Sequence, residues 1–417
     1  MPPKCPRGTL STETSAGAGA RWVTRLVPCF LLLLVAYATY VVVERICLDD
    51  LIRERDEPSQ AAVFLALYFV FLFFSLTSYI RTIWVVKTEP GYVPLHPSSR
   101  GARVLRRRAR RRNTIRNAFA RRYDDADEEA DVGYALPDHS PDSPGLESFY
   151  SKDVFVCEGD GRPKWCHDCG QWKPDRASHS REIDRCVRKM DHFCPWVGGM
   201  VAENSFKFFA QFTFYAALFC AVSLSAAAYS LAHQVRRGAV LDGHLFAVIF
   251  LAGLLGMFSA AMSGIAARFI LANMTNVDLL KKRLSYQLAV RVPLGTPSTE
   301  RFMTITYPLP RGVPNGTAAP EPEGRDRFAR RTFAVLRTEP GENPWDLGWR
   351  RNWTEVMGHT PLDWLLPIKR SPCARHECAE SEYPYGKLVP ELKARYGLDP
   401  KPWTDREEAI EMRERGR

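Results

Sequence analysis

The sequence predicts an all-α integral membrane protein, with four transmembrane helices and a cysteine-rich domain between the second and the third. The first observation is a set of four apolar runs, of 18, 20, 24 and 23 residues, without Asp, Glu, Lys, Arg or His. A helix that crosses a bilayer needs about 20 such residues. The other two observations are a strongly basic loop between the second and third runs and the cysteine spacing inside it. The runs are residues 26–43, 61–80, 208–231 and 245–267.

Composition excludes other classes of protein. The 417-residue chain has a net charge of +10 and a mean hydropathy of −0.24, an average that conceals the apolar runs. Four uncharged runs of this length exclude a single soluble globule, because buried runs in soluble cores are shorter. The chain is neither collagen-like nor fully disordered, and its 11 cysteines are too sparse for a small disulfide scaffold.

The first apolar run has two interpretations. Ala36-Tyr37-Ala38 resembles a signal-peptide cleavage site. However, the run continues through Val43, and about 25 residues precede it, more than the short charged region that begins a signal peptide. We therefore expect a retained membrane span.

The distribution of basic residues predicts the orientation. Residues 81–207 contain 23 Lys and Arg, against three in residues 44–60 and two in residues 232–244. Because cytosolic loops carry the excess of Lys and Arg, the long middle loop is expected in the cytosol. With four spans, the N-terminal residues 1–25 and the tail 268–417 lie on the same side. The expected protein is thus a multi-pass protein of an endomembrane or the plasma membrane.

Residues 81–160 are predicted to be a linker of opposite charge blocks. Residues 103–122 contain ten Arg, and residues 124–131 contain six acids. Such blocks are usually solvated and disordered. Contact of the basic block with anionic lipids of the cytosolic leaflet is the alternative, and both interpretations stay open. A nucleic-acid partner is not expected for a chain with four spans.

The cysteine-rich domain, residues 161–207, contains a metal-ligand pattern. Its spacing is C-x2-C-x9-H-x6-C, formed by Cys166, Cys169, His179 and Cys186. Thiolate and imidazole ligands suit tetrahedral zinc, and a gap of two residues lets one tight turn aim two sulfurs at the ion. A cytosolic loop keeps its thiols reduced, so a disulfide is not expected. Three cysteines and one histidine fill the coordination shell, which predicts one structural zinc ion.

Cys194 is predicted to be a nucleophile. It lies in the sequence Asp191-His192-Phe193-Cys194-Pro195, and Pro195 disfavours helical geometry at Cys194. In an extended segment, His192 and Cys194 point to the same face. His192 can then accept the thiol proton while Asp191 orients the imidazole ring. The segment precedes the third span by roughly ten residues, so the thiol is expected at the cytosolic interface.

These residues and their position resemble the DHHC-type protein S-acyltransferases, the palmitoyltransferases. The resemblance covers the four spans and the cysteine-rich loop, whose signature is Asp-His-Phe-Cys here, a form similar to a divergent fungal subgroup. Residues 87–91, Lys-Thr-Glu-Pro-Gly, resemble the Asp-Pro-Gly element of that family. Residues 275–278, Thr-Asn-Val-Asp, resemble its Thr-Thr-x-Glu element with two changes. Residues 343–358 resemble its C-terminal aromatic motif.

The chain departs from the family at one of two metal sets. The resemblance implies two zinc ions, and one ligand set matches the four residues named above. The second set falls on Ser180, Ile183, Phe193 and Met200, none of which is a good zinc ligand. Loss of the whole set suggests that a hydrophobic cluster replaces the second ion, which also explains the phenylalanine in the signature.

The resemblance implies a palmitoyltransferase that uses palmitoyl-CoA and acts on cysteines of protein substrates at the cytosolic face of the lipid bilayer. The catalytic residues would be Cys194, His192 and Asp191, with the acyl chain held in the helix bundle. Four basic residues are candidates for binding the phosphates of coenzyme A: Arg181, Arg185, Arg188 and Lys189. The alternative is a membrane adaptor that uses the zinc module to bind partners. A membrane ubiquitin ligase is a weaker rival, because such domains generally need two interleaved zinc sites.

Overall fold

The structure is a computed structural model that describes residues 18–95, 143, 145–281, 285–309, 330–374, 376 and 383–399. The basic run 103–122, the acidic run 124–131 and residues 1–17 lie outside this described part. The expectations about the linker charges and the start of the N-terminal segment therefore concern residues on which the structure gives no information.

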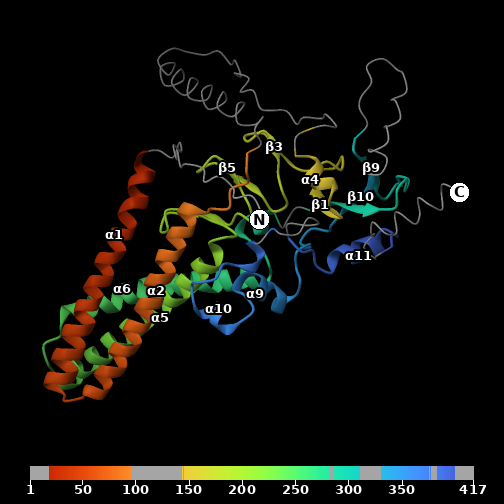
Figure 1. Cartoon of the computed structure of the whole chain (residues 1–417). Coiled ribbons are helices and arrows are strands. Elements are labelled where there is room, and N and C mark those ends of the chain that lie inside the picture. Colours follow the sequence, from red (N-terminus) through yellow and green to blue (C-terminus); the bar gives the residue numbers. More distant parts are fainter. Residues whose placement is uncertain are drawn as a thin grey trace, which may run out of the picture.

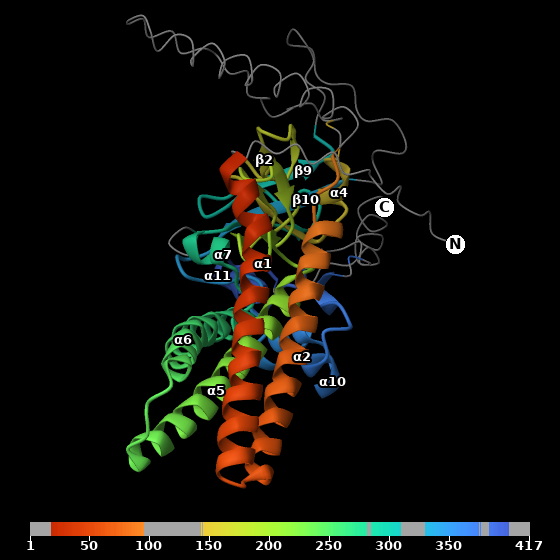
Figure 2. The same ribbon diagram turned by 90° about the vertical axis from the view of Figure 1, so that its left-hand side faces the viewer.

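Four long helices form a bundle (Figure 1 and Figure 2). They are α1 (Ala18–Tyr40), which continues as the π-helix η1 (Val41–Glu54), α2 (Pro58–Thr88), α5 (Phe206–Arg237) and α6 (Gly243–Leu271). In the described part of the chain, all four are long and apolar enough to cross a membrane. Each includes one predicted apolar run. Such a run forms a helix because a backbone in lipid must satisfy its hydrogen bonds internally.

The first helix extends well past its apolar run. The charged residues after Val43 stay helical in η1, so only three residues, 55–57, connect it to α2. Charged residues of η1 form ion pairs: Arg45 contacts Asp49 at 3.3 Å and Asp242 at 3.1 Å. The buried Asp50 accepts a hydrogen bond from Ser230 Oγ at 2.6 Å. This polar layer closes the end of the bundle opposite to the cysteine-rich domain (Figure 1).

The cysteine-rich domain is built from three short antiparallel hairpins. Strands β2 (Trp165–Cys166) and β3 (Gln171–Trp172) form the first, and β4 (Ser178–Ser180) and β5 (Arg185–Val187) the second. The third joins β6 (His192–Cys194) to β7 (Gly199–Val201), directly before α5. The connection from α2 docks on the second hairpin, where Val93 N–H donates to the carbonyl of Cys186 at 2.9 Å.

The expectation of an all-α protein is wrong outside the helix bundle. An antiparallel sheet has the order β1-β8-β10-β9. Strand β1 (Val154–Cys157) precedes the cysteine-rich domain, and the others come from the predicted tail: β8 (Gln287–Val292), β9 (Met303–Tyr307) and β10 (Arg331–Arg337). Leu288, Val290 and Leu336 are completely or almost completely buried in its core. Short strands rich in β-branched residues give a much weaker sequence signal than membrane helices.

Short helices complete the described chain: α4 (Glu147–Tyr150), α7 (Asn276–Lys281), α9 (Trp349–Met357), α10 (Pro361–Leu365), the 3-10 turn η2 (Pro372–Ala374) and α11 (Leu388–Arg395). The tail returns to the bundle at α10. Gln211 Nε2 donates to the carbonyl of Trp364 and Tyr215 Oη to that of Leu365, both at 2.8 Å. The sheet, the hairpins and these helices all gather at one end of the bundle (Figure 1 and Figure 2).

Candidate active site and metal cluster

The third hairpin holds the predicted nucleophile against the helix bundle. Cys194 pairs with Gly199 across β6 and β7, and Gly198 N–H donates to the carbonyl of Cys194 at 3.0 Å. A side chain at position 199 would not fit, because a Cβ atom there would lie 2.4 Å from Cγ1 of Val86 on α2. The glycine therefore allows the hairpin to approach the bundle closely. Cys194 is consequently buried, with 4% of its surface exposed.

The three predicted catalytic residues lie together. His192 Nδ1 and Asp191 Oδ2 are 2.6 Å apart, and the carboxylate is buried. The ring of His192 packs edge-on against Phe209 of α5, with centroids 5.3 Å apart. Burial lowers the pKa of His192, but hydrogen bonds to Asp191 and to Cys194 outweigh burial and raise that pKa to about 9. The structure thus contains a thiol, an imidazole base and an orienting carboxylate in one hydrogen-bonded chain.

Asn276 is a further residue of the site, and its role was not predicted from the sequence. Its backbone N–H donates to Asp191 Oδ1 at 2.8 Å, and its Nδ2 donates to Asp191 Oδ2 at 2.9 Å. It stands at the start of α7, in the element where the chain departs from the Thr-Thr-x-Glu pattern. The resemblance of that element was the only sequence signal for this contact.

A buried polar network lies behind the site and includes Lys189, one of the candidates for binding coenzyme A. Arg176 donates to Asp278 Oδ2 at 2.6 Å and to Asn273 Oδ1 at 2.8 Å. Lys189 Nζ donates to the same Asn273 oxygen at 3.0 Å. Lys189 is 7% exposed and its ammonium group is bonded to Asn273, which disfavours it as a residue that binds the phosphates of coenzyme A. Its ammonium group instead connects the cysteine-rich domain to the segment that follows α6.

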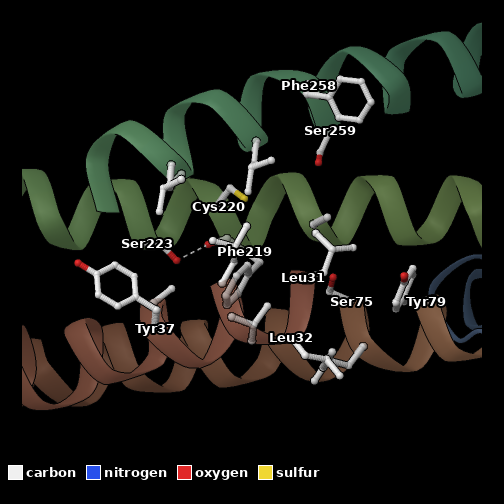
Figure 3. A pocket seen from close by; sticks show the side chains of 18 of the residues that line it. Leu31, Leu32, Tyr37, Ser75, Tyr79, Phe219, Cys220, Ser223, Phe258 and Ser259 are labelled. Atoms are coloured by element: carbon white, nitrogen blue, oxygen red, sulfur yellow. Dashed lines mark hydrogen bonds between the residues drawn. The ribbon is translucent and has the colours of Figure 1, made fainter. Parts of the chain in front are cut away.

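An apolar cavity of about 1100 Å³, including space open to the outside, runs between the four long helices. Side chains from α1, α2, α5 and α6 line it, among them Leu31, Phe219 and Phe258 (Figure 3). Tyr79 lies at one end of the view of the cavity, and Tyr37 and Ser223 lie toward the other end (Figure 3). Trp196 also lines the cavity. The lining is almost entirely hydrocarbon, which suits a long alkyl chain.

The nucleophile lies beside this cavity. Tyr79 Oη donates to the carbonyl of Trp196 at 2.7 Å, and both residues line the cavity. Trp196 is two residues after Cys194, and Cys194 packs in the same hydrophobic cluster as Tyr79 and Val197. The thiol of Cys194, which belongs to a polar triad, therefore lies next to the apolar cavity.

The predicted metal ligands form a second cluster. The ligand atoms of Cys166, Cys169, His179 and Cys186 all lie within 4.8 Å of one another, the one such group of metal-binding side chains found among the described residues. His179 Nδ1 is 3.6 Å from Cys166 Sγ and 3.4 Å from Cys169 Sγ. Strand pairing sets the geometry, because His179 lies directly opposite Cys186 in the second hairpin.

The outer contacts of this cluster fit a metal site. His179 Nε2, the nitrogen that faces away from the sulfurs, is 3.6 Å from carboxylate oxygens of both Asp168 and Asp184. Metal-binding histidines commonly direct their second nitrogen to a carboxylate in this way. Three thiols and one imidazole in a closed group suit tetrahedral zinc.

The four replaced positions of the second metal set divide into one polar and three apolar residues. Ile183, Phe193 and Met200 belong to one hydrophobic cluster, together with the completely buried Val187. Phe193 and Met200 face each other across β6 and β7. Ser180 is buried and donates to Glu182 Oε2 at 2.6 Å. Apolar packing thus occupies the place where the family resemblance implies a second ion.

The aromatic motif of the tail closes the back of the site. Asn352 Nδ2 donates to the carbonyl of Leu271, at the end of α6, at 2.7 Å. Asn343 Nδ2 donates to the carbonyl of Ala272 at 2.8 Å. Trp345 is buried, and the guanidinium of Arg176 lies 4.8 Å from the centre of its ring. These contacts fix the start of α7, and hence Asn276, relative to the bundle.

Together, these features define a multi-helix membrane protein in which a thiol of a hydrogen-bonded triad lies beside an apolar cavity, with a cluster of metal-type ligands nearby. The profile of the DHHC palmitoyltransferase family matches residues 160–283. Palmitoyltransferase pfa5 of Aspergillus fumigatus is 40% identical over 403 residues, which cover 90% of each chain. The protein of the same name from Emericella nidulans is 37% identical, over 91% of this chain and 87% of its own.

A more distant relative is palmitoyltransferase PFA3 of Candida albicans, which is 27% identical over 49% of this chain and 47% of its own. The extent and identity of the pfa5 matches are decisive. The chain belongs to the DHHC palmitoyltransferase family.

Proposed function

We propose that the protein is a palmitoyl-CoA-dependent S-acyltransferase that transfers a long-chain acyl group to cysteine thiols of protein substrates through a thioester on Cys194. The observation that carries this proposal is the chain of Asp191, His192 and Cys194 beside the apolar cavity. Family membership supports the reaction class, and the geometry supports the roles of these residues.

In the first step, His192 takes the proton of Cys194, and the raised pKa of its imidazole favours the protonated ring that this transfer produces. Because Nδ1 of His192 is held by Asp191, its Nε2 is the nitrogen available for this proton. The thiolate attacks the carbonyl carbon of the acyl-CoA thioester, and the bond between that carbon and the sulfur of coenzyme A breaks. Coenzyme A leaves as a thiol after taking the proton from His192, which leaves the acyl group on Cys194.

In the second step, a cysteine of the protein substrate attacks the Cys194 thioester. His192 accepts the proton of the incoming thiol and returns it to Cys194 Sγ as that sulfur leaves. The enzyme is regenerated and the substrate carries the acyl group. One base serves both steps, because each step exchanges one sulfur for another at the same carbonyl carbon.

The cavity is proposed to hold the acyl chain. Each CH₂ group removed from water contributes about 0.8 kcal/mol, so a long chain is bound much more strongly than a short one. This binding places the thioester at the cavity end near Trp196, next to Cys194.

The cluster of Cys166, Cys169, His179 and Cys186 is proposed to hold one structural zinc ion. Bound there, the ion would cross-link the first two hairpins and contribute to folding of the domain. With four protein ligands it has no open position for a substrate. The residues that act on the acyl group are therefore those of the third hairpin.

We propose that the hairpins, the sheet and the tail lie in the cytosol. The helix ends near them carry the excess of basic residues. At α10, Leu362 and Leu365 are 66% and 51% exposed while the backbone is bonded to Gln211 and Tyr215 of α5. These apolar side chains would contact the cytosolic leaflet. The expected placement in an endomembrane or the plasma membrane follows from the spans alone.

The alternative function is a membrane adaptor without catalysis. Measuring how much coenzyme A the protein releases distinguishes this adaptor from an enzyme. Purified protein in detergent should release about one coenzyme A per chain in a rapid first phase, followed by steady release when a cysteine peptide is added. His192→Ala should slow both phases, because the thiol loses its base. An adaptor would release none above the rate of spontaneous hydrolysis.

A further inference from the structure

The tight turn that follows Cys194 has a conformation that bears on the chemistry of this residue. Residues 195–198 connect β6 to β7, and Gly198 N–H donates to the carbonyl of Cys194 at 3.0 Å. A bond between residues four positions apart closes a single turn of α-helical type. Pro195 is the first residue of this turn, where its fixed φ fits and its missing N–H is not needed. Cys194 is extended and stands immediately before the turn.

This geometry directs two backbone N–H groups toward the side chain of Cys194. In a turn of α-helical type, the second and third residues point their N–H groups back at the side chain of the residue before the turn. Here these residues are Trp196 and Val197. Among the described residues, no acceptor pairs with either N–H group. Two adjacent donors therefore remain available beside the nucleophile.

The N–H group of Val197 is unusual because it is both unpaired and buried. Val197 is 1% exposed and packs in one hydrophobic cluster with Cys194 and Tyr79. Buried backbone N–H groups are nearly always paired, so an orphan of this kind requires an explanation such as a bound ligand or a catalytic role. Its neighbour Trp196 lines the acyl cavity. The reacting carbonyl group is the acceptor that would satisfy both donors.

We propose that the N–H groups of Trp196 and Val197 form the oxyanion hole of the acyl transfer. The proposal rests on the proposed function, in which the thioester lies near Trp196 and next to Cys194. When the thiolate adds to the carbonyl carbon, the electron pair of the C=O double bond moves to the oxygen, which becomes an oxyanion. The two N–H groups donate to this oxygen until the bond to the sulfur of coenzyme A breaks and the carbonyl re-forms.

The surroundings of the turn strengthen these donors. Cys194 and Val197 are both almost completely buried, so little water competes for the oxyanion. A hydrogen bond to a charged oxygen is stronger in such a medium than in water. The turn is also held in place, because Tyr79 Oη donates to the carbonyl of Trp196 at 2.7 Å and Gly199 lies close against α2. Fixed donors need no reorganisation as the charge develops.

The oxyanion hole and the triad act on different atoms, which makes their contributions separable. His192 removes the thiol proton, whereas the two N–H groups contact only the oxygen of the acyl group. Alkylation of Cys194 by iodoacetamide needs the thiolate but forms no oxyanion, because the sulfur displaces iodide from a saturated carbon. Loss of an oxyanion-hole donor should therefore slow acylation and leave alkylation unchanged.

Replacing one amide by an ester removes a single N–H group and keeps the side chain. The α-hydroxy analogue of valine, placed at position 197 of the full chain by nonsense suppression, gives this variant. The ester also makes the carbonyl of Trp196, which accepts from Tyr79, a weaker acceptor. It is therefore made in a Tyr79→Phe background and compared with Tyr79→Phe alone, so that loss of this bond is common to both proteins.

Single-turnover loading of Cys194 from palmitoyl-CoA should fall about 100-fold in the ester variant, while alkylation by iodoacetamide should change less than about threefold. An ester at position 196 should behave alike and replaces the first variant if that one does not fold. His192→Ala should slow both reactions, because it lacks the base.

Undiminished loading of the ester variants would overturn the oxyanion hole. An equal loss of loading and alkylation would also overturn it, since the N–H groups would then act on the thiolate or on the fold. Absence of loading in the wild-type chain is a different result, because it contradicts the proposed function itself. The failure of the oxyanion hole and the failure of the proposed function are thus distinguishable.

Discussion

Asn276 donates two hydrogen bonds to Asp191, one from its backbone at 2.8 Å and one from its side chain at 2.9 Å. The side-chain bond goes to Asp191 Oδ2, the oxygen that also contacts His192 Nδ1 at 2.6 Å. Asn276 is therefore a positioning residue, which fixes the carboxylate that orients the base. It connects the segment after the fourth long helix to the catalytic hairpin.

The first prediction follows from this contact. Asn276→Ala should slow acylation of Cys194 by ~10- to 100-fold, because the carboxylate loses one of its two anchors and the imidazole is less well oriented. Asn276→Asp should slow acylation of Cys194 still more, since two carboxylates would then face each other. Single-turnover loading from palmitoyl-CoA measures both. Wild-type loading by Asn276→Ala, in a folded protein, would show that the side-chain contact is dispensable.

The second prediction concerns pH. Burial opposes protonation of His192, but hydrogen bonds to Asp191 and Cys194 raise its pKa to about 9, from 6.5 in the unfolded chain. A raised pKa contributes stability that is complete below pH 6.5 and is lost as pH rises through about 9. The contribution is on the order of 3 kcal/mol at most.

Melting curves in detergent between these pH values measure this effect. The stability difference between wild type and His192→Gln should shrink as pH rises from 6.5 to 9, the unfolded and folded pKa values. The two proteins are compared at equal zinc content, so that titration of His179 does not cause the pH dependence of the stability difference. A difference that is constant with pH would be inconsistent with a protonated His192 in the folded protein.

The third prediction is one tightly bound zinc ion per chain. Elemental analysis of purified protein should give this count, and removal of the ion should unfold the cysteine-rich domain. Phe193→His should not create a second site, because Ser180, Ile183 and Met200 still supply no good ligand. It should instead lower the melting temperature by placing a polar ring among apolar side chains. Two ions per chain would refute apolar replacement, and none would refute the metal cluster.

The fourth prediction tests the cavity. Ala216 lines the cavity from α5, so Ala216→Phe should block long acyl chains and reduce palmitoyl loading more than loading of a short acyl-CoA. Ala221→Phe is the matched control, because Ala221 is exposed on the same helix and does not line the cavity. An equal effect of the two substitutions would mean that the acyl chain lies elsewhere.

The sequence predicted the helix bundle well because each helix contains an uncharged run. It did not predict η1, since the charged residues after Val43 resemble a loop until their partners are known. Arg45, for example, pairs with Asp242 on a different connection. The sheet was missed for another reason. Strand β8 has six residues and β9 has five, lengths at which periodicity discriminates poorly.

The site was predictable where its residues are close in sequence. The extended backbone at His192 and Cys194 follows from the proline after the cysteine, and the grouping of the four metal-type ligands follows from their spacing. Contacts over long sequence distances were not predictable. Asn276 is 85 residues from Asp191, and Lys189 donates to Asn273, from the segment that follows α6. A basic residue near a site looks solvent-accessible until the segment that covers it is known.

The central claim is that Cys194 carries the acyl group, and mass spectrometry of the loaded protein tests it most directly. After incubation with palmitoyl-CoA, the chain should gain the mass of one palmitoyl group. Hydroxylamine should remove that group, and peptide mapping should locate it on Cys194. Cys194→Ser should lose the hydroxylamine-sensitive label, whereas Cys157→Ser, at another buried cysteine, should keep it. A full hydroxylamine-sensitive label on Cys194→Ser would contradict the account.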